Sequence, residues 1–204
     1  MILMICIGLH VEHLTMESVN NMDWRLVADA IDHYTAAGFT YIDTPWMVDP
    51  AIASITCPDR RYHDMILQNN TVLVASAEQG FLELETHGHL HDKKYVSCGP
   101  CWRIRDAKEN QDGFHHETFV KVELYVRCES DHEAHCAAQE LVNNAKLFLS
   151  HDPVVVVTGV SSWDLELNGI EIGSYGARRH HNIIWAYGTG LALPRYREAL
   201  NANN

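Results

Sequence analysis

Apolar residues recur at helical spacing in two segments of the chain. Residues 23–37 repeat them every three or four positions, and Gly38 follows where a helix would end. Residues 130–150 begin with Ser-Asp-His-Glu, a sequence that caps helices, and they place alanines and leucines on one face. Each segment is therefore predicted to form an amphipathic helix that packs on one side.

Short runs of alternating or β-branched residues predict strands. These runs are residues 39–45, 71–75, 95–104, 118–126, 154–157, 163–167 and 170–172. The valine-rich run 154–157 is predicted to lie in the interior of a sheet. Asn168-Gly169, a strong turn dipeptide, joins the last two runs into a hairpin that carries carboxylates.

Composition narrows the class of protein. The 204 residues suffice for one large domain, and no linker-like run divides them. With 15 Lys and Arg residues and a net charge of −12, the chain is a poor candidate for sequence-independent binding to nucleic acid. Residues 1–8 are apolar but too short to span a bilayer, and they are predicted to form a buried strand. Six scattered cysteines are typical of reduced thiols, so we expect a cytoplasmic protein.

The segment 185–195 has the features of an anion site. Small residues alternate with larger ones, which would let the backbone pass close to a ligand, and Pro194-Arg195 then opens a helical segment. Backbone N–H groups, the helix dipole and the guanidinium of Arg195 would converge on a phosphate there, with Asp164 or Glu171 holding the accompanying metal. The alternative is an ordinary turn with solvated acidic residues nearby.

The strands 95–104 and 118–126 flank a long polar loop, and ordered loops of this length are often functional. Arg103 on the first strand can clamp an anion, and Phe119 on the second can stack on a ring. Cys98 and Cys101 have the spacing of a redox pair, but the strand-like sequence around them favours two structural thiols.

Three parts of the chain resemble, in order, the three signature motifs of class II aminoacyl-tRNA synthetases. The helix, glycine, strand and proline of residues 23–45 are similar to the first motif, which in that family forms the dimer interface. Residues 101–119 resemble the second motif, and residues 188–195 resemble the third in its seryl-type form. One position departs from the pattern, because Arg105 stands where the family usually has an acid.

This resemblance implies a site for ATP and Mg²⁺. Arg103 would bind the α-phosphate and Arg195 the γ-phosphate, and both would be the catalytic residues. Phe119 would stack on adenine. The full set implied for the nucleotide is Arg103, His115, Phe119, Asp164, Glu171 and Arg195, of which Asp164 and Glu171 would also bind the magnesium ion.

Three further residues are candidates for binding the substrate. Residues 76–78 follow a predicted buried strand and resemble the loop that receives the amino group in seryl- and prolyl-type synthetases. Glu78 and Glu123 offer negative charge to an ammonium, and Arg178 matches an arginine that binds a side-chain carboxylate in the aspartyl type. The pocket would then suit a small, acidic or polar amino acid. The alternatives are that Glu78 caps a helix and that Arg178 pairs with an acid such as Glu166 or lies in solvent.

The resemblance covers nearly the whole chain and implies an α+β fold, a mixed, mainly antiparallel sheet flanked by helices. Residues 1–204 are expected to form a single class II synthetase-like catalytic domain without an anticodon-binding domain. The implied activity is ATP-dependent adenylation of a small amino acid or related carboxylic acid, with tRNA or another molecule as acceptor. The expected assembly is a homodimer without a membrane contact. The competing interpretation is a catalytically inactive synthetase-like dimer that acts as a regulatory or interaction protein.

Overall fold

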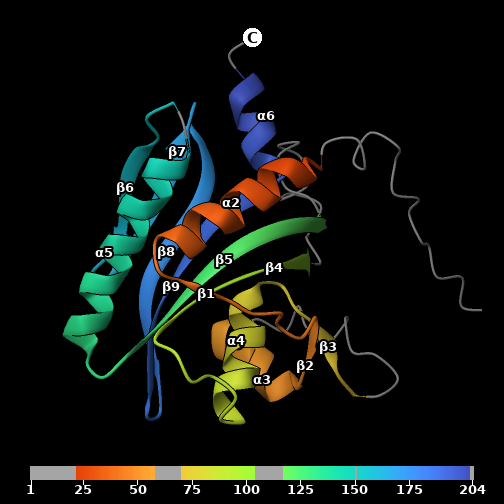
Figure 1. The fold of residues 1–204 in the computed structure, drawn as a ribbon, viewed down its shortest axis with the longest axis vertical. Coiled ribbons are helices and arrows are strands. Elements are labelled where there is room, and N and C mark those ends of the chain that lie inside the picture. Colours follow the sequence, from red (N-terminus) through yellow and green to blue (C-terminus); the bar gives the residue numbers. More distant parts are fainter. Residues whose placement is uncertain (1–21, 58–69, 104–116, 150, 203–204) are drawn as a thin grey trace, which may run out of the picture.

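A computed structural model of the chain describes residues 22–57, 70–103, 117–149 and 151–202, which form a large sheet with helices on both faces (Figure 1). The sheet has seven strands in the order β1-β4-β5-β9-β8-β7-β6. Their bounds are β1 Thr40–Tyr41, β4 Lys94–Trp102, β5 Thr118–Cys128, β6 Val154–Gly159, β7 Ser162–Leu167, β8 Ile170–His180 and β9 Ile183–Leu193. A second, two-stranded sheet consists of β2 (Met47–Val48) and β3 (Val72–Leu73).

The seven-stranded sheet is mixed and mainly antiparallel, which confirms the predicted fold class. Its β1–β4 pair is parallel, and all its other neighbouring pairs are antiparallel. The predicted hairpins are β4–β5 and β7–β8. The β7–β8 turn places Asn168 and Gly169 at φ 55° and 77°, a conformation that asparagine and glycine adopt more readily than other residues.

The helices begin mostly where a polar side chain caps them. Their bounds are α2 Trp24–Ala36, α3 Pro50–Thr56, α4 Ala77–Thr86, α5 Asp131–Phe148 and α6 Arg195–Asn201. Asp23, Ser76 and Ser130 each accept a hydrogen bond from a first-turn N–H, at the starts of α2, α4 and α5. Helices α2 and α5 are the two amphipathic helices that the sequence predicts.

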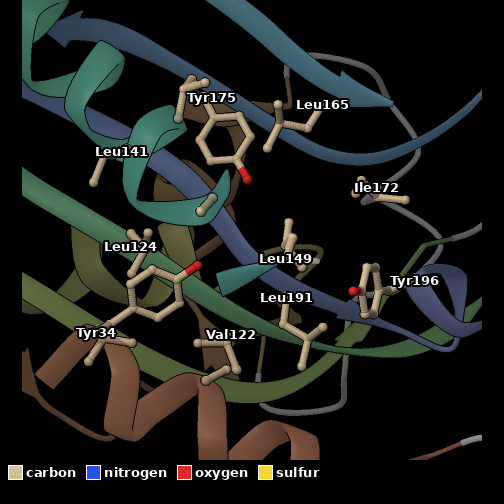
Figure 2. Close-up of a cluster of buried hydrophobic side chains, with 14 of the residues drawn as sticks. Tyr34, Val122, Leu124, Leu141, Leu149, Leu165, Ile172, Tyr175, Leu191 and Tyr196 are labelled. Carbon is tan, nitrogen blue, oxygen red and sulfur yellow. The ribbon is translucent and has the colours of Figure 1, made fainter. Parts of the chain in front are cut away.

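Helices α2, α5 and α6 contribute to the larger apolar core on one face of the sheet, part of which Figure 2 shows. Strand β5 supplies Val122 and Leu124 to this core from alternate positions. Tyr34 of α2 and Leu141 of α5 are buried among them (Figure 2). The residues that alternate with Val122 and Leu124 along β5 therefore face the opposite side of the sheet, where the candidate site lies.

Helix α4 packs on that opposite face over an aromatic cluster. The ring centroids of Phe81 and Tyr125 lie 5.1 Å apart in a stacked arrangement, and Tyr125 in turn stacks on Trp185 at 6.4 Å. All three side chains are buried. The cluster fixes the start of α4 above the sheet, and with it Ser76 and Glu78.

Two glycines of β9 contact core side chains, not a ligand. A Cβ atom at Gly188 would lie 2.6 Å from Cδ1 of Tyr175, and one at Gly190 would lie 2.5 Å from Cε2 of Tyr34. The Tyr34 hydroxyl also donates a hydrogen bond to the carbonyl of Gly190 at 3.0 Å. The prediction that small residues here bring the backbone close to a ligand is therefore wrong for these two positions, because they make room for tyrosine rings.

Strand β6 lies at the edge of the sheet, so its prediction as an interior strand is wrong. Within the described residues it pairs with β7 alone, and Val154 and Val157 are 64% and 70% exposed. A run of β-branched residues favours an extended backbone wherever the strand lies. It does not encode the position of the strand in the sheet.

Some predictions fall on residues beyond the described ranges. They are the buried strand at residues 1–8, the nucleotide contact of His115 and the departure at Arg105. Among the helices of the described ranges, none combines the length and the apolar character needed to cross a bilayer.

Candidate active site

The candidate site is a cavity of about 260 Å³ on the face of the sheet that carries α4. It is bordered by residues that follow β4, by β5, β8 and β9, and by the start of α6. Its charged and aromatic lining consists of Arg103, Phe119, Lys121, Glu171 and Arg195. The structure thus brings together four residues that the motifs assign to ATP, from segments 92 positions apart at most. Their roles stay predictions.

Arg103 and Phe119 form one wall of the cavity. The guanidinium carbon of Arg103 lies 5.2 Å from the centroid of the Phe119 ring. Its Nε donates a hydrogen bond to the carbonyl of Ala75 at 3.3 Å, a contact that does not use the terminal nitrogens. Phe119 sits directly across from Cys101 in the β4–β5 ladder, so the position of its ring is fixed by the hairpin. The pair offers a cation next to an aromatic face.

Arg195 opens α6 and lines the cavity together with Glu171 of β8. Its Nη1 lies 3.5 Å from Oε1 of Glu171 and 3.4 Å from the carbonyl oxygen of the same residue. Its side chain is 17% exposed, whereas that of Glu171 is 46% exposed. The arginine is therefore held at the cavity by β8, and the carboxylate remains accessible to a cation.

Asp164 lies on β7 opposite Ser174 of β8, a residue that lines the cavity. Burial raises the pKa of Asp164 above its usual value, and the nearby carboxylates of Glu171 and Glu166 act in the same direction, opposed by a hydrogen bond from Ser174. Mutual repulsion of this kind is relieved by a bound cation. The described residues contain no group of three or more metal-ligating side chains. Two carboxylates beside the predicted phosphate contacts nevertheless fit Mg²⁺, which usually takes one or two protein carboxylates together with phosphate oxygens.

Glu123 is a buried carboxylate with a full set of donors. It accepts hydrogen bonds from the Ser76 hydroxyl at 2.7 and 2.8 Å, from the Glu78 backbone N–H at 3.1 Å and from the Lys121 ammonium at 2.5 Å. Burial acts to raise the pKa of Glu123, but the Lys121 charge and these hydrogen bonds outweigh it and hold the pKa below 4.5. Glu123 is thus ionised and fixed at the start of α4.

Glu78 makes contacts beyond the start of α4. Its Oε1 accepts a hydrogen bond from Nε1 of Trp185 at 2.7 Å, and its Oε2 lies 3.1 Å from Nη1 of Arg178. The Arg178 guanidinium covers the ring of Tyr187 at 4.3 Å. Burial raises the pKa of Glu78, although Arg178 and Trp185 act to lower it. Ser76, not Glu78, caps the helix through its side chain.

The pair of Glu78 and Arg178 changes the reasoning about the substrate. The argument that an apolar amino acid would leave Arg178 buried without a partner is wrong, because Glu78 already neutralises it. The alternative that Arg178 pairs with an acidic residue is confirmed, but the partner is Glu78 and not Glu166. Sequence spacing could not reveal this pair, because its members are 100 residues apart.

Three residues of the cavity with polar side chains carry no predicted role. Lys121 lies between Phe119 and Glu123 on the same face of β5, and alternation alone could have placed it at the site. Ser174 and Thr189 face each other across β8 and β9, where Thr189 Oγ1 accepts a hydrogen bond from the Ser174 N–H at 3.3 Å. Thr189 belongs to residues 188–195, which resemble the third motif, but the resemblance assigns it no role, and Ser174 lies outside the three motifs.

The two cysteines with redox-pair spacing are structural thiols, as predicted. Cys101 faces the same side of β4 as its ladder partner Phe119, whereas Cys98 packs against the core on the other face. Side chains of a strand alternate between the two faces of the sheet, so residues three positions apart lie on opposite faces. Burial raises the pKa of Cys101 to about 12 and that of Cys98 to about 11.

Known proteins resemble the chain in sequence and in fold. No protein-family model matches it. It is 26% identical over 194 residues to the serine–tRNA ligase of Staphylothermus marinus and 26% identical over 198 residues to that of Hyperthermus butylicus. Each alignment covers 90% of this chain and 40% of the relative. The chain therefore spans less than half the length of these relatives.

Solved structures share the fold. The seryl-tRNA synthetase from Pyrococcus horikoshii, complexed with ATP, superimposes with a TM-score of 0.71 and 19% identity over 89% of this chain and 51% of that one. A pyrrolysyl-tRNA synthetase from Desulfitobacterium hafniense gives a TM-score of 0.69 and 16% identity over 88% of this chain and 69% of the other.

Proposed function

We propose that this chain is a class II aminoacyl-tRNA synthetase catalytic core that activates a small polar amino acid by transferring AMP from ATP to its carboxylate. The observation that carries the proposal is the cavity in which Arg103, Lys121 and Arg195 stand around Phe119 and Glu171. Three cations and an aromatic ring suit a polyphosphate joined to a base. The sequence relationship to serine–tRNA ligases supports the same reaction type.

The reaction requires little acid-base catalysis. The carboxylate oxygen of the amino acid attacks the α-phosphorus of ATP, a bond to that oxygen forms, and the bond to pyrophosphate breaks. Arg103 would stabilise charge on the α-phosphate, and Arg195 would hold the γ-phosphate of the leaving group. Positioning by fixed cations is sufficient for such a displacement, since the nucleophile is already ionised.

Phe119 and Glu171 would complete the nucleotide site. The Phe119 ring would stack on adenine, beside the Arg103 guanidinium that lies 5.2 Å from it. Glu171 and Asp164 would hold Mg²⁺, whose chemistry when bound is to neutralise phosphate charge and favour departure of pyrophosphate. Before Mg²⁺ is bound, the contact of Arg195 with Glu171 keeps both side chains at the cavity.

The start of α4 would bind the amino group. Glu123 and Glu78 are buried carboxylates there, and Glu123 is ionised. The next residue on the same face of β5 is Tyr125, which is buried under Phe81 together with Trp185. These rings fill the space behind Glu123, so we infer a small side chain for the substrate. Because Glu78 neutralises Arg178, we do not extend the proposal to an acidic side chain.

We further propose that the chain forms a homodimer through α2 and the segment that follows it. Large apolar side chains are exposed there, namely Trp24, Tyr41, Trp46 and Met47, at 62%, 41%, 54% and 48%. Single exposed apolar residues are ordinary, but four in residues 24–47, which include the segment that resembles the first motif and the two residues just after it, favour an interface. Transfer of the activated amino acid to tRNA, or to another acceptor, belongs to the same proposal.

The test is amino-acid-dependent exchange of labelled pyrophosphate into ATP, measured with each of the twenty amino acids. We expect exchange with a small polar amino acid, serine first, and its loss in Arg103→Ala. Arg179→Ala, which changes an exposed arginine paired with Asp131, is the control that should retain exchange. Absence of exchange with all twenty amino acids would support the inactive synthetase-like dimer instead.

A further inference from the structure

Lys121 lies between the proposed site for ATP and the proposed site for the amino acid. It lies between Phe119 and Glu123 on one face of β5, so it separates the proposed adenine position from the proposed ammonium position. Its side chain lines the cavity and is 12% exposed. In the β5–β9 ladder its partner is Ala192, a small residue that also lines the cavity.

The Lys121 ammonium is bound to the carboxylate that the substrate would need. Its Nζ lies 2.5 Å from Oε1 of Glu123, while Ser76 and the backbone of Glu78 fix the rest of that carboxylate. Glu123 is therefore held in place by α4, whereas Lys121 has a flexible side chain next to open space. Of the two partners, the lysine is the one that can move.

We propose that an amino-acid substrate inserts into this ion pair, and the inference rests on the function proposed above. The α-ammonium of the substrate replaces Lys121 at Glu123, and the released lysine ammonium binds the substrate carboxylate. Each buried charge keeps an opposite partner before and after binding, so that neither Lys121 nor Glu123 is left unpaired. The carboxylate is thereby held next to Arg103, which would bind the α-phosphate that it attacks.

The insertion sets a requirement for both charges of the substrate. A ligand with an ammonium but no carboxylate would displace Lys121 without giving it a new partner. A ligand with a carboxylate but no ammonium would draw Lys121 away from Glu123 and leave that carboxylate unpaired. Each of these ligands would leave one buried charge without a partner, which is unfavourable. A free α-amino acid is therefore bound in preference to its amine and acid analogues.

The experiment compares Lys121→Met with wild type in titration calorimetry, at saturating concentration of a non-hydrolysable ATP analogue. The ligands are serine and its decarboxylated analogue, ethanolamine. If the exchange assay selects another amino acid, that amino acid and its decarboxylated analogue replace them. We expect the variant to bind the amino acid about 10- to 100-fold more weakly, because a charge-assisted contact is lost. We expect it to bind the amine more tightly than wild type does, because Glu123 no longer has a competing ammonium.

Opposite changes for the two ligands distinguish this role from a structural one, since a distorted site would weaken both. Lys94→Met is the matched control, because Lys94 is also a strand lysine paired with a glutamate, Glu140, at 3.5 Å. The Lys94→Met variant should bind both ligands with the affinities of wild type. Lys121→Arg, which keeps the charge, should lose less affinity for the amino acid than Lys121→Met.

Unchanged amino-acid affinity in Lys121→Met, or weaker binding of both ligands, would overturn the inference about Lys121. Wild-type exchange activity would remain in that case, and the proposed function would stand. Absence of exchange by wild type with every amino acid contradicts the proposed function itself, so the two failures are distinguishable.

Discussion

Nη1 of Arg178 lies 3.1 Å from Oε2 of Glu78, and the same guanidinium covers the ring of Tyr187 at 4.3 Å. The Glu78 side chain is 8% exposed, and that of Arg178 is 34% exposed. In a charge pair that is this buried, each partner mainly offsets the cost of removing the other charge from water. Removing one partner therefore costs more free energy of unfolding than removing both. The contact ties the start of α4 to β8.

Arg178→Met should therefore destabilise the protein by about 1–3 kcal/mol, because it leaves the buried Glu78 carboxylate without its cation. The double variant Glu78→Gln with Arg178→Met should recover part of that loss. Urea unfolding measures all three free energies. Arg179→Met is the control: its pair with Asp131 is exposed on both sides, and we expect a change of about 0–1 kcal/mol. Equal losses for Arg178→Met and Arg179→Met would contradict a special role for the buried pair.

Arg195→Ala should weaken ATP binding more than AMP binding. The arginine is proposed to contact the γ-phosphate, which AMP lacks, and a charge-assisted contact of this kind contributes about 1.5–3 kcal/mol. Titration calorimetry with both nucleotides measures the difference. Arg197→Ala alters an arginine of the same helix that pairs with Asp23, and it should leave both affinities unchanged. The same loss for ATP and AMP in Arg195→Ala would refute the assignment to the γ-phosphate.

Glu123 and Glu78 should give opposite pH dependences of stability. The folded-state pKa of Glu123 is below 4.5, so its charge contributes stability that is present above pH 4.5 and is lost as the pH falls through the folded pKa. The folded-state pKa of Glu78 is above 4.5, so Glu78 takes up a proton at a higher pH in the folded chain than in the unfolded chain. Relative to a neutral variant, wild type gains stability as the pH falls through that pKa toward 4.5.

The measurement is urea unfolding of wild type, Glu123→Gln and Glu78→Gln between neutral and acidic pH. The stability advantage of wild type over Glu123→Gln should shrink in acid below pH 4.5. The difference between wild type and Glu78→Gln should move in favour of wild type above pH 4.5, as the solution is acidified. If the two differences in free energy of unfolding change with pH in the same direction, the two carboxylates do not titrate as their environments indicate.

The sequence predicts the fold well where the signal is local. The alternation of residues 118–126 indicates a strand with one apolar face, and Ser130 marks the start of α5 through its capping side chain. The spacing of Arg103 and Phe119 around a loop suffices to place Phe119 on the second strand of a hairpin and Arg103 at the end of the first. These features depend on neighbours in the chain, and neighbours are what a sequence pattern records.

The remaining features depend on contacts between distant segments. Gly190 fits beneath Tyr34, and the two residues lie 156 positions apart, so no pattern near Gly190 distinguishes a core contact from a ligand contact. The exposed position of Val157 follows from the order of strands in the sheet, which its β-branched side chain does not determine. The motifs were enough to predict that Arg103, Phe119, Glu171 and Arg195 gather around one cavity, whereas the ion pairs near it could not be predicted.

The proposed homodimer should depend on the exposed apolar residues near α2. Trp46→Ser with Met47→Ser should shift the chain toward monomer, because both side chains are about half exposed and would be buried by a partner. Sedimentation velocity at micromolar concentration measures the distribution. Val154→Ser with Val157→Ser, on the exposed edge strand β6, is the control and should leave it unchanged. A wild-type protein that sediments as a monomer would argue against the dimer.

The most direct test of amino-acid activation follows one oxygen atom. The protein is incubated with ATP, Mg²⁺, hydroxylamine and the amino acid selected by the exchange assay, labelled with ¹⁸O in its carboxylate. Attack on the α-phosphorus makes one labelled oxygen bridge carbon and phosphorus. Hydroxylamine then attacks the acyl carbon, and that oxygen leaves with AMP. Mass spectrometry should find AMP with one ¹⁸O atom and an equal amount of the amino-acid hydroxamate. AMP without the label, or no AMP, would contradict adenylation of the carboxylate.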